Sequence, residues 1–257
     1  MISGAIVIWR ALVHLYDESL LMLKANLMWF FGSIPLFLLV LGVCWLFVPP
    51  TTLPAEGAEE AVPVLWPLML SAFVLLVVPS PFSTALTALT AEIVEGETPE
   101  FALFWRTLRR WWLRSLLMFA VGAALLGALI FNTSFYASLT DSWLQPVAVV
   151  WLYGIVFWLT MQMYLVPIML AAPEDAAGNE QASLLVIYKR AAILALANPI
   201  FSLVLFLAIV LIMVLCAVAL PVYPLVAMSL SSLIGSRALK FLRDKYFPSE
   251  TEAEGAE

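Results

Sequence analysis

The side chains that could do chemistry in this chain are few and far apart. His14 is the only histidine, and Cys44 and Cys216 are the only cysteines, among 257 residues. A single histidine cannot supply a His-rich metal site or a His/Glu zinc motif. Neither glycine-rich phosphate-binding pattern occurs in the sequence. We therefore expect no metal and no cofactor.

Five long stretches contain no charged residue and would leave any nucleophile without an acidic or histidine base. Asp, Glu, Lys and Arg are absent from residues 25–55, 61–91, 115–140, 142–173 and 191–236. Nucleophilic catalysis needs a base within reach of the Ser or Cys, and an aspartyl pair needs two carboxyl groups. The sequence therefore predicts a protein that is not an enzyme. Glu92 borders one stretch, where it is either an interfacial carboxylate, solvated or paired with an arginine of 106–114, or a group for ion coupling.

Uncharged polar residues inside the apolar stretches form a candidate intramembrane polar face: Thr84, Thr87, Gln162, Ser229 and Ser232. Such residues could line a path for a polar solute. They could equally allow helices to approach closely and hydrogen-bond to each other in the membrane. Both interpretations remain open from the sequence.

The segment 98–114 is the second candidate site, because basic and aromatic side chains alternate along it. Its candidate surface for lipid or a partner protein comprises Trp105, Arg106, Arg109, Arg110 and Arg114. Arginines and tryptophans on a membrane-surface helix can bind anionic lipid or a partner, or simply anchor and orient the chain. A nucleic-acid site is not expected.

The elements that carry these residues are predicted to be transmembrane helices. Apolar residues make up 64% of the chain, charged residues 12%, and the mean hydropathy is +1.02, far more apolar than a soluble domain. One crossing needs about 20 apolar residues. We predict an all-α, polytopic helical bundle of about six spans at 25–48, 62–90, 114–133, 144–172, 199–220 and 222–243, within one domain, 1–246.

The basic residues predict the orientation of these spans. With six spans, all twelve Lys and Arg residues fall on one side, which the positive-inside rule makes cytoplasmic. Both termini are then cytoplasmic, in the cell membrane. Amphipathic segments 4–20, 98–113 and 180–194 are predicted to lie along that surface, and the acidic tail 247–257 to be disordered.

Several motifs resemble the YesL-like family of bacterial multi-pass membrane proteins, whose biochemical role is not established. They are Asn26-Leu27-Met28-Trp29 with Ser33-Ile34-Pro35, Pro81-Phe82-Ser83-Thr84-Ala85-Leu86, the segment Phe101 to Arg114, Tyr164-Leu165-Val166-Pro167, and Leu194-Ala195-Leu196-Ala197-Asn198-Pro199. The resemblance covers most of residues 20–245. It implies a membrane protein associated with carbohydrate uptake systems.

Two functional hypotheses follow. The first is a non-enzymatic accessory or interaction protein that contacts membrane lipid and another membrane protein or a transporter subunit, in a solute uptake system. The alternative is a transporter or channel-like permease for a small solute, with the polar face as its path.

Overall fold

The described part of the chain consists of α-helices connected by short segments. The computed structural model describes residues 2–46, 62–139, 143–171, 183–218 and 223–246, and no strand occurs among them. The helices are α1 (Ile2–Asp17), α2 (Ser19–Gly32), α3 (Ile34–Leu46), α4 (Val62–Val77), α5 (Pro81–Glu95), α6 (Ala102–Ser138), α7 (Val147–Ala171), α8 (Leu184–Ala197), α9 (Pro199–Val218) and α10 (Tyr223–Tyr246). The predicted tail 247–257 lies outside the described residues.

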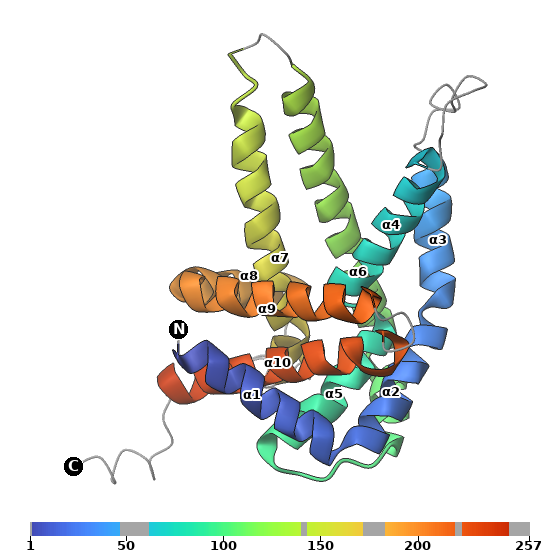
Figure 1. Ribbon diagram of the computed structural model, residues 1–257, viewed down its shortest axis with the longest axis vertical. Helices are drawn as coiled ribbons and strands as arrows, with labels where there is room; N and C mark the ends of the chain where they lie inside the picture. The colour runs from blue at the N-terminus through green and yellow to red at the C-terminus, as the bar shows by residue number, and fades with distance from the viewer. Residues whose placement is uncertain (1, 47–61, 140–142, 172–182, 219–222, 247–257) are drawn as a thin grey trace.

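Three pairs of neighbouring helices form the frame of the molecule. In Figure 1, α3 with α4 and α6 with α7 extend toward the same end, whereas α9 and α10 run crosswise and contact α7. Helix α1 lies beside α10, and α5 lies at the base, where it contacts α2, α6, α7 and α10. Helices α2, α6, α7 and α10 therefore meet around α5.

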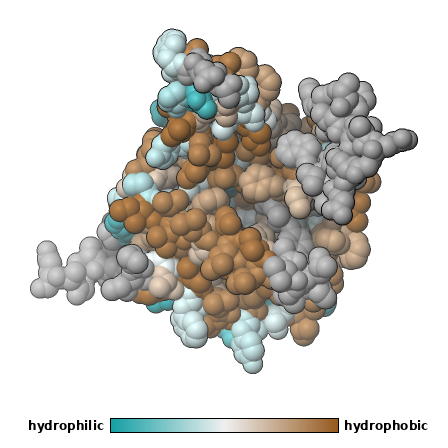
Figure 2. All heavy atoms as spheres, turned by 45° about the horizontal axis from the view of Figure 1, so that its top comes forward, coloured by the Kyte–Doolittle hydropathy of each residue, from teal (hydrophilic) through white to brown (hydrophobic). Residues whose placement is uncertain are grey.

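The distribution of apolar side chains matches a lipid environment. In the inner helices α7 and α10, 61% and 56% of the most apolar 18-residue stretch is buried inside the protein. Only 11% of the corresponding stretch is buried in α9 and in the segment formed by α2 and α3. Large apolar side chains remain exposed along the outer helices, including Leu38, Leu117, Leu207 and Leu211. Figure 2 shows the resulting hydrophobic surface, brown over much of the face drawn. A monomeric soluble protein rarely exposes so large an apolar surface to water. The protein is an all-α, polytopic membrane protein.

The segment 62–90, predicted as one span, differs in the structure because it contains a break. Helix α4 ends at Val77, and α5 begins at Pro81. Ser80 has an extended backbone and caps α5: its side chain accepts a hydrogen bond from Ser83 N at 3.2 Å, while the Ser83 hydroxyl accepts one from Ser80 N at 2.7 Å. Proline at the first helical position and a reciprocal cap favour a new helix here. The resemblance motif that begins at Pro81 thus starts a helix.

In the segment 98–133, by contrast, a break was predicted and the structure has none. A surface helix over 98–113 and a span over 114–133 were predicted, but α6 is one continuous helix of 37 residues. At a rise of 1.5 Å per residue, α6 is about 55 Å long, whereas the hydrocarbon core is about 30 Å thick. The arginine-bearing end therefore extends well beyond the length needed for one crossing.

Five helical segments in the described ranges are long and apolar enough to cross a membrane: Ser19–Leu46, Ala102–Ser138, Val147–Ala171, Pro199–Cys216 and Leu225–Tyr246. The remaining predicted span, 62–90, is the interrupted one, whose α4 has only 16 residues. The predicted surface segments 4–20 and 180–194 correspond to α1 and α8. With six spans, the side opposite the basic residues carries Glu56, Glu59, Glu60 and Asp141, and all four lie outside the described ranges.

Candidate functional site

Helix α5 is buried along most of its length, although it carries many hydroxyl groups. Thr84, Thr87 and Thr90 each expose 3% or less of their surface. Each donates to a backbone carbonyl one turn earlier: Thr84 to Ser80 O at 3.0 Å, Thr87 to Ser83 O at 2.8 Å, and Thr90 to Thr87 O at 2.9 Å. Bonds within the helix reduce the cost of burying these hydroxyls.

Two hydroxyl pairs join α5 to α10. Thr87 Oγ1 lies 2.6 Å from Ser232 Oγ, and Thr90 Oγ1 lies 3.1 Å from Ser236 Oγ. Because each threonine donates its only proton to a carbonyl, the serine is the donor in each pair. These contacts connect helices that are about 145 residues apart in the chain. Of the predicted polar face, Thr87 and Ser232 are thus brought together, whereas Thr84 bonds only within α5 in the interactions described.

Ser229, another member of the predicted polar face, contacts α2. Asn26 Oδ1 accepts hydrogen bonds from Ser229 N at 2.8 Å and from the Ser229 hydroxyl at 3.0 Å, and that hydroxyl also lies 3.1 Å from Met22 O. Asn26 and Ser229 are completely buried. Asn26 was not among the predicted polar-face residues, although it belongs to a resemblance motif, because it lies at the very start of the predicted span 25–48. Its amide joins α2 to α10.

Gln162 lies apart from these bonded pairs and faces a cavity. Its side chain is only 5% exposed, and neither Nε2 nor Oε1 has a hydrogen-bond partner among the described residues. The cavity has a volume of about 290 Å³ and is bordered by α4, α5, α7, α9 and α10. Thr87 and Ser232 also line it, but Thr84 and Ser229 do not. The predicted polar face is therefore divided between a cavity and two helix interfaces.

The predicted basic surface is also divided. Trp105, Arg106 and Arg109 are exposed on α6, while Phe104 and Leu108 are buried on the opposite side of the same helix. The remaining two arginines contact an aromatic ring: the guanidinium carbons of Arg110 and Arg114 lie 5.9 Å and 5.5 Å from the centre of the Trp111 ring. Cation–π contacts of this kind order the side chains. The exposed part of the surface is therefore Trp105, Arg106, Arg109 and Arg110, while Arg114 is half-buried.

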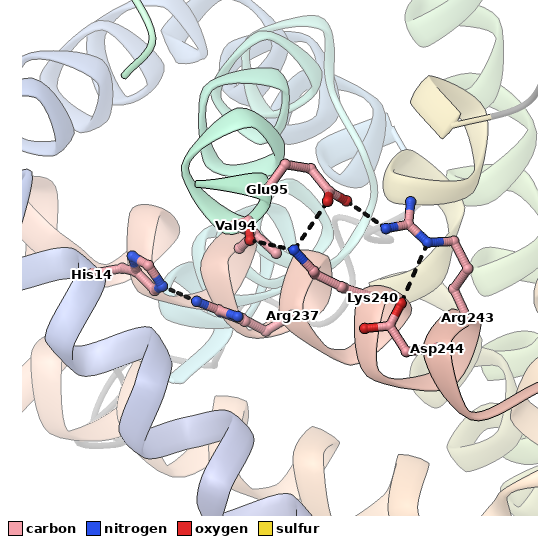
Figure 3. A network of polar contacts seen from close by, with 7 residues as sticks. All are labelled: His14, Val94, Glu95, Arg237, Lys240, Arg243 and Asp244. Atoms are coloured by element: carbon pink, nitrogen blue, oxygen red, sulfur yellow. Dashed lines mark hydrogen bonds and ion pairs between the residues drawn. The ribbon is translucent and has the colours of Figure 1, made fainter. Parts of the chain in front are cut away.

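Charged groups meet where the ends of α1, α5 and α10 come together, as Figure 3 shows. Glu95 accepts hydrogen bonds from Lys240 at 3.0 Å and from Arg243 at 2.8 Å. Partial burial opposes ionisation of Glu95, but the two cations outweigh burial and lower its pKa. Lys240 also donates to Val94 O at 3.0 Å. This carboxylate therefore fixes the end of α5 against α10.

His14 belongs to the same region and contacts Arg237. Burial and the neighbouring Arg237 lower the pKa of His14 below 6.5. A neutral ring nitrogen can accept a hydrogen bond from the guanidinium group, whereas a protonated ring would repel it. Glu92 is different: burial and nearby Glu97 raise its pKa, while Arg106 favours its charged form.

The fold and these interfaces define the class as a polytopic membrane protein with an all-helical core. No protein-family model, no curated protein and no solved structure matches the chain. The resemblance to the YesL-like family therefore stays a prediction based on the motifs.

Proposed function

We propose that the protein is a non-catalytic accessory protein of the cell membrane that docks to another membrane protein through the cationic end of α6. The observation that supports this is the exposure of Trp105, Arg106 and Arg109 on one side of a helix whose other side is buried. The rigid packing of Phe104 and Leu108 presents the exposed groups in a fixed orientation. The positive-inside rule favours the cytoplasmic side for this end.

The chemistry of this surface suits an acidic partner. Guanidinium groups bind carboxylates through paired hydrogen bonds, and tryptophan is favoured at interface centres. Arg106 and Arg109 lie about one helical turn apart, so a partner helix or loop with two nearby carboxylates could bind both. A transporter subunit of a solute uptake system fits the association that the YesL-like resemblance implies. Anionic lipid is the competing occupant.

The proposal is tested by charge reversal and recovery of partners. The tagged protein is purified in mild detergent from native membranes, alongside Arg106→Glu/Arg109→Glu. Loss of two charge-assisted contacts should reduce the recovered partner by about tenfold or more. The matched control is Lys189→Glu/Arg190→Glu, which makes the same change of charge at two exposed positions on α8. The control should retain the partner.

Two outcomes contradict the accessory role. One is equal partner recovery from both charge-reversed variants. The other is reproducible purification without any protein partner, together with binding to anionic vesicles that is lost in the α6 variant, since lipid would then be the occupant.

A second candidate is a transporter or channel for a small solute. This candidate is favoured because one cavity is lined by Thr87, Ser232 and Gln162. Solute flux in liposomes that contain only this protein would support this candidate and reject the accessory role.

A further inference from the structure

The cavity beside Gln162 has mostly apolar walls and five polar lining residues, Ser83, Thr87, Gln162, Ser231 and Ser232. Its walls include Phe73 of α4, Val166 of α7, and Phe206, Val210 and Met213 of α9. The volume of about 290 Å³ is close to the lower end of the range of about 300–1,000 Å³ for small-molecule sites. It is also about twice the 150 Å³ of a dry apolar cavity that binds benzene. The space therefore suits a hydrocarbon chain.

Among the described polar residues that line this cavity, Gln162 is the one whose side-chain polar atoms have no hydrogen-bond partner. The Ser231 hydroxyl donates to Ala227 O at 3.0 Å, and Thr87 and Ser232 bond to each other at 2.6 Å. The Gln162 side chain has two N–H donors on Nε2 and a carbonyl acceptor, Oε1. Neither Nε2 nor Oε1 has a hydrogen-bond partner among the described residues. A buried amide of this kind is costly unless an incoming group satisfies it.

The cavity carries no charge to match a charged ligand. Among the described residues that line it, none is Asp, Glu, Lys, Arg or His. Transfer of an unpaired charge into apolar surroundings is much more costly than transfer of a neutral polar group. The polar end of a bound molecule must therefore be uncharged.

We infer that this cavity is a binding site for an uncharged, lipid-like molecule with an apolar chain and one hydrogen-bonding head group, such as a long-chain alcohol, whose head binds Gln162. A hydroxyl suits the amide, because it can accept from Nε2 and donate to Oε1. The chain lies between α9 and the face formed by α4 and α7. This inference is independent of the accessory role, since the α6 surface does not line the cavity.

The test uses three probes with the same chain: 1-decanol, decane and decyltrimethylammonium. Each is added to the full-length protein held in amphipol without detergent, and binding is followed by the thermal-unfolding midpoint. 1-Decanol should raise the midpoint more than the other two. Its apparent affinity should fall by about two- to tenfold in Gln162→Leu, the range of one neutral hydrogen bond.

Two comparisons separate binding from folding. Without a probe, Gln162→Leu should unfold at or above the wild-type temperature, because it removes a buried unpaired amide. The matched control is Thr160→Val, on the same helix, whose hydroxyl donates to Phe157 O at 2.7 Å and which does not line the cavity. The control should bind 1-decanol with wild-type affinity. Val210→Trp, which fills the cavity from α9, should abolish binding.

Three results overturn the inference. Decane that stabilises the wild type as well as 1-decanol does would show ordinary hydrocarbon in the cavity. Preference for decyltrimethylammonium would contradict an uncharged head group. Unchanged 1-decanol affinity in both Gln162→Leu and Val210→Trp would place the alcohol elsewhere and leave water as the partner of Gln162.

Discussion

At the scale of single residues, the polar groups of the membrane core differ in whether they already have partners. Hydroxyls on α5 and α10 bond to carbonyls and to each other, and the Asn26 amide oxygen bonds to Ser229. Gln162 alone among the predicted polar-face residues has a side chain without a partner in the described part of the chain. The sequence could identify these five positions as polar but could not divide them, because the division depends on which helix faces which.

His14 provides a residue-scale prediction about pH. Its lowered pKa means that the unfolded chain binds a proton more readily than the folded protein between the folded pKa and 6.5. The stability contributed by the neutral ring is therefore present above pH 6.5 and is lost as the pH falls below it. The thermal-unfolding midpoint should decrease from about pH 7.5 to about pH 5.5, a window chosen around the histidine pKa.

The comparison variant is His14→Gln, which keeps an acceptor for Arg237 but does not titrate in this range. Its unfolding midpoint should change less with pH than that of the wild type. Equal pH dependence in the two proteins would assign the effect to another group.

At the scale of elements, close helix contacts depend on small residues. A Cβ atom at Gly235 of α10 would lie 2.9 Å from the backbone oxygen of Met163 of α7. Backbone cannot move aside as a side chain can, so Gly235→Ala should destabilise the protein by about 1–3 kcal/mol, the usual cost of overpacking. Thermal unfolding in detergent measures the change.

Gly127→Ala on α6 is the matched control, because nothing lies within 4 Å of its added Cβ. Alanine is the better helix former, so this variant should be as stable as the wild type or more stable. A Gly235→Ala protein with wild-type stability would show that α7 and α10 are less closely packed than described.

Helix boundaries show where sequence reasoning succeeds and where it does not. Apolar composition was sufficient to predict an all-α membrane bundle, because lipid requires backbone groups to be satisfied within helices. The break between α4 and α5 was not predicted, since no charged residue interrupts the segment 61–91. The Ser80 and Ser83 cap could have revealed it. The continuity of α6 was also not predicted, because the residues change from basic to apolar after Arg114, as expected where a surface helix meets a span. No Gly or Pro is present at this change, so the helix does not end there.

At the scale of the whole molecule, orientation in the membrane is the main testable property. Helices α6 and α7 are consecutive and run in opposite directions (Figure 1). Arg109 near the start of α6 and Lys189 after α7 are therefore expected on one side of the membrane, and Trp143, between the two helices, on the other. In a Cys44→Ala/Cys216→Ala background, Arg109→Cys and Lys189→Cys should be protected from an impermeant maleimide in intact cells. Trp143→Cys, at a position that is 85% exposed, should react.

Permeabilised cells are the control, and all three positions should react there. Reaction of Arg109→Cys and Trp143→Cys from the same compartment in intact cells would contradict the orientation and place the cationic surface away from cytoplasmic partners.

The unbroken length of α6 has a mechanical consequence. A helix that is longer than its bilayer adjusts to membrane thickness by tilting. Because no hinge separates the lipid-facing half of α6 from Arg106 and Arg109, any change in the tilt of α6 moves the arginine-bearing end together with α5, against which α6 packs. Thinning or thickening of the bilayer would therefore be converted into displacement of the cationic group above its surface.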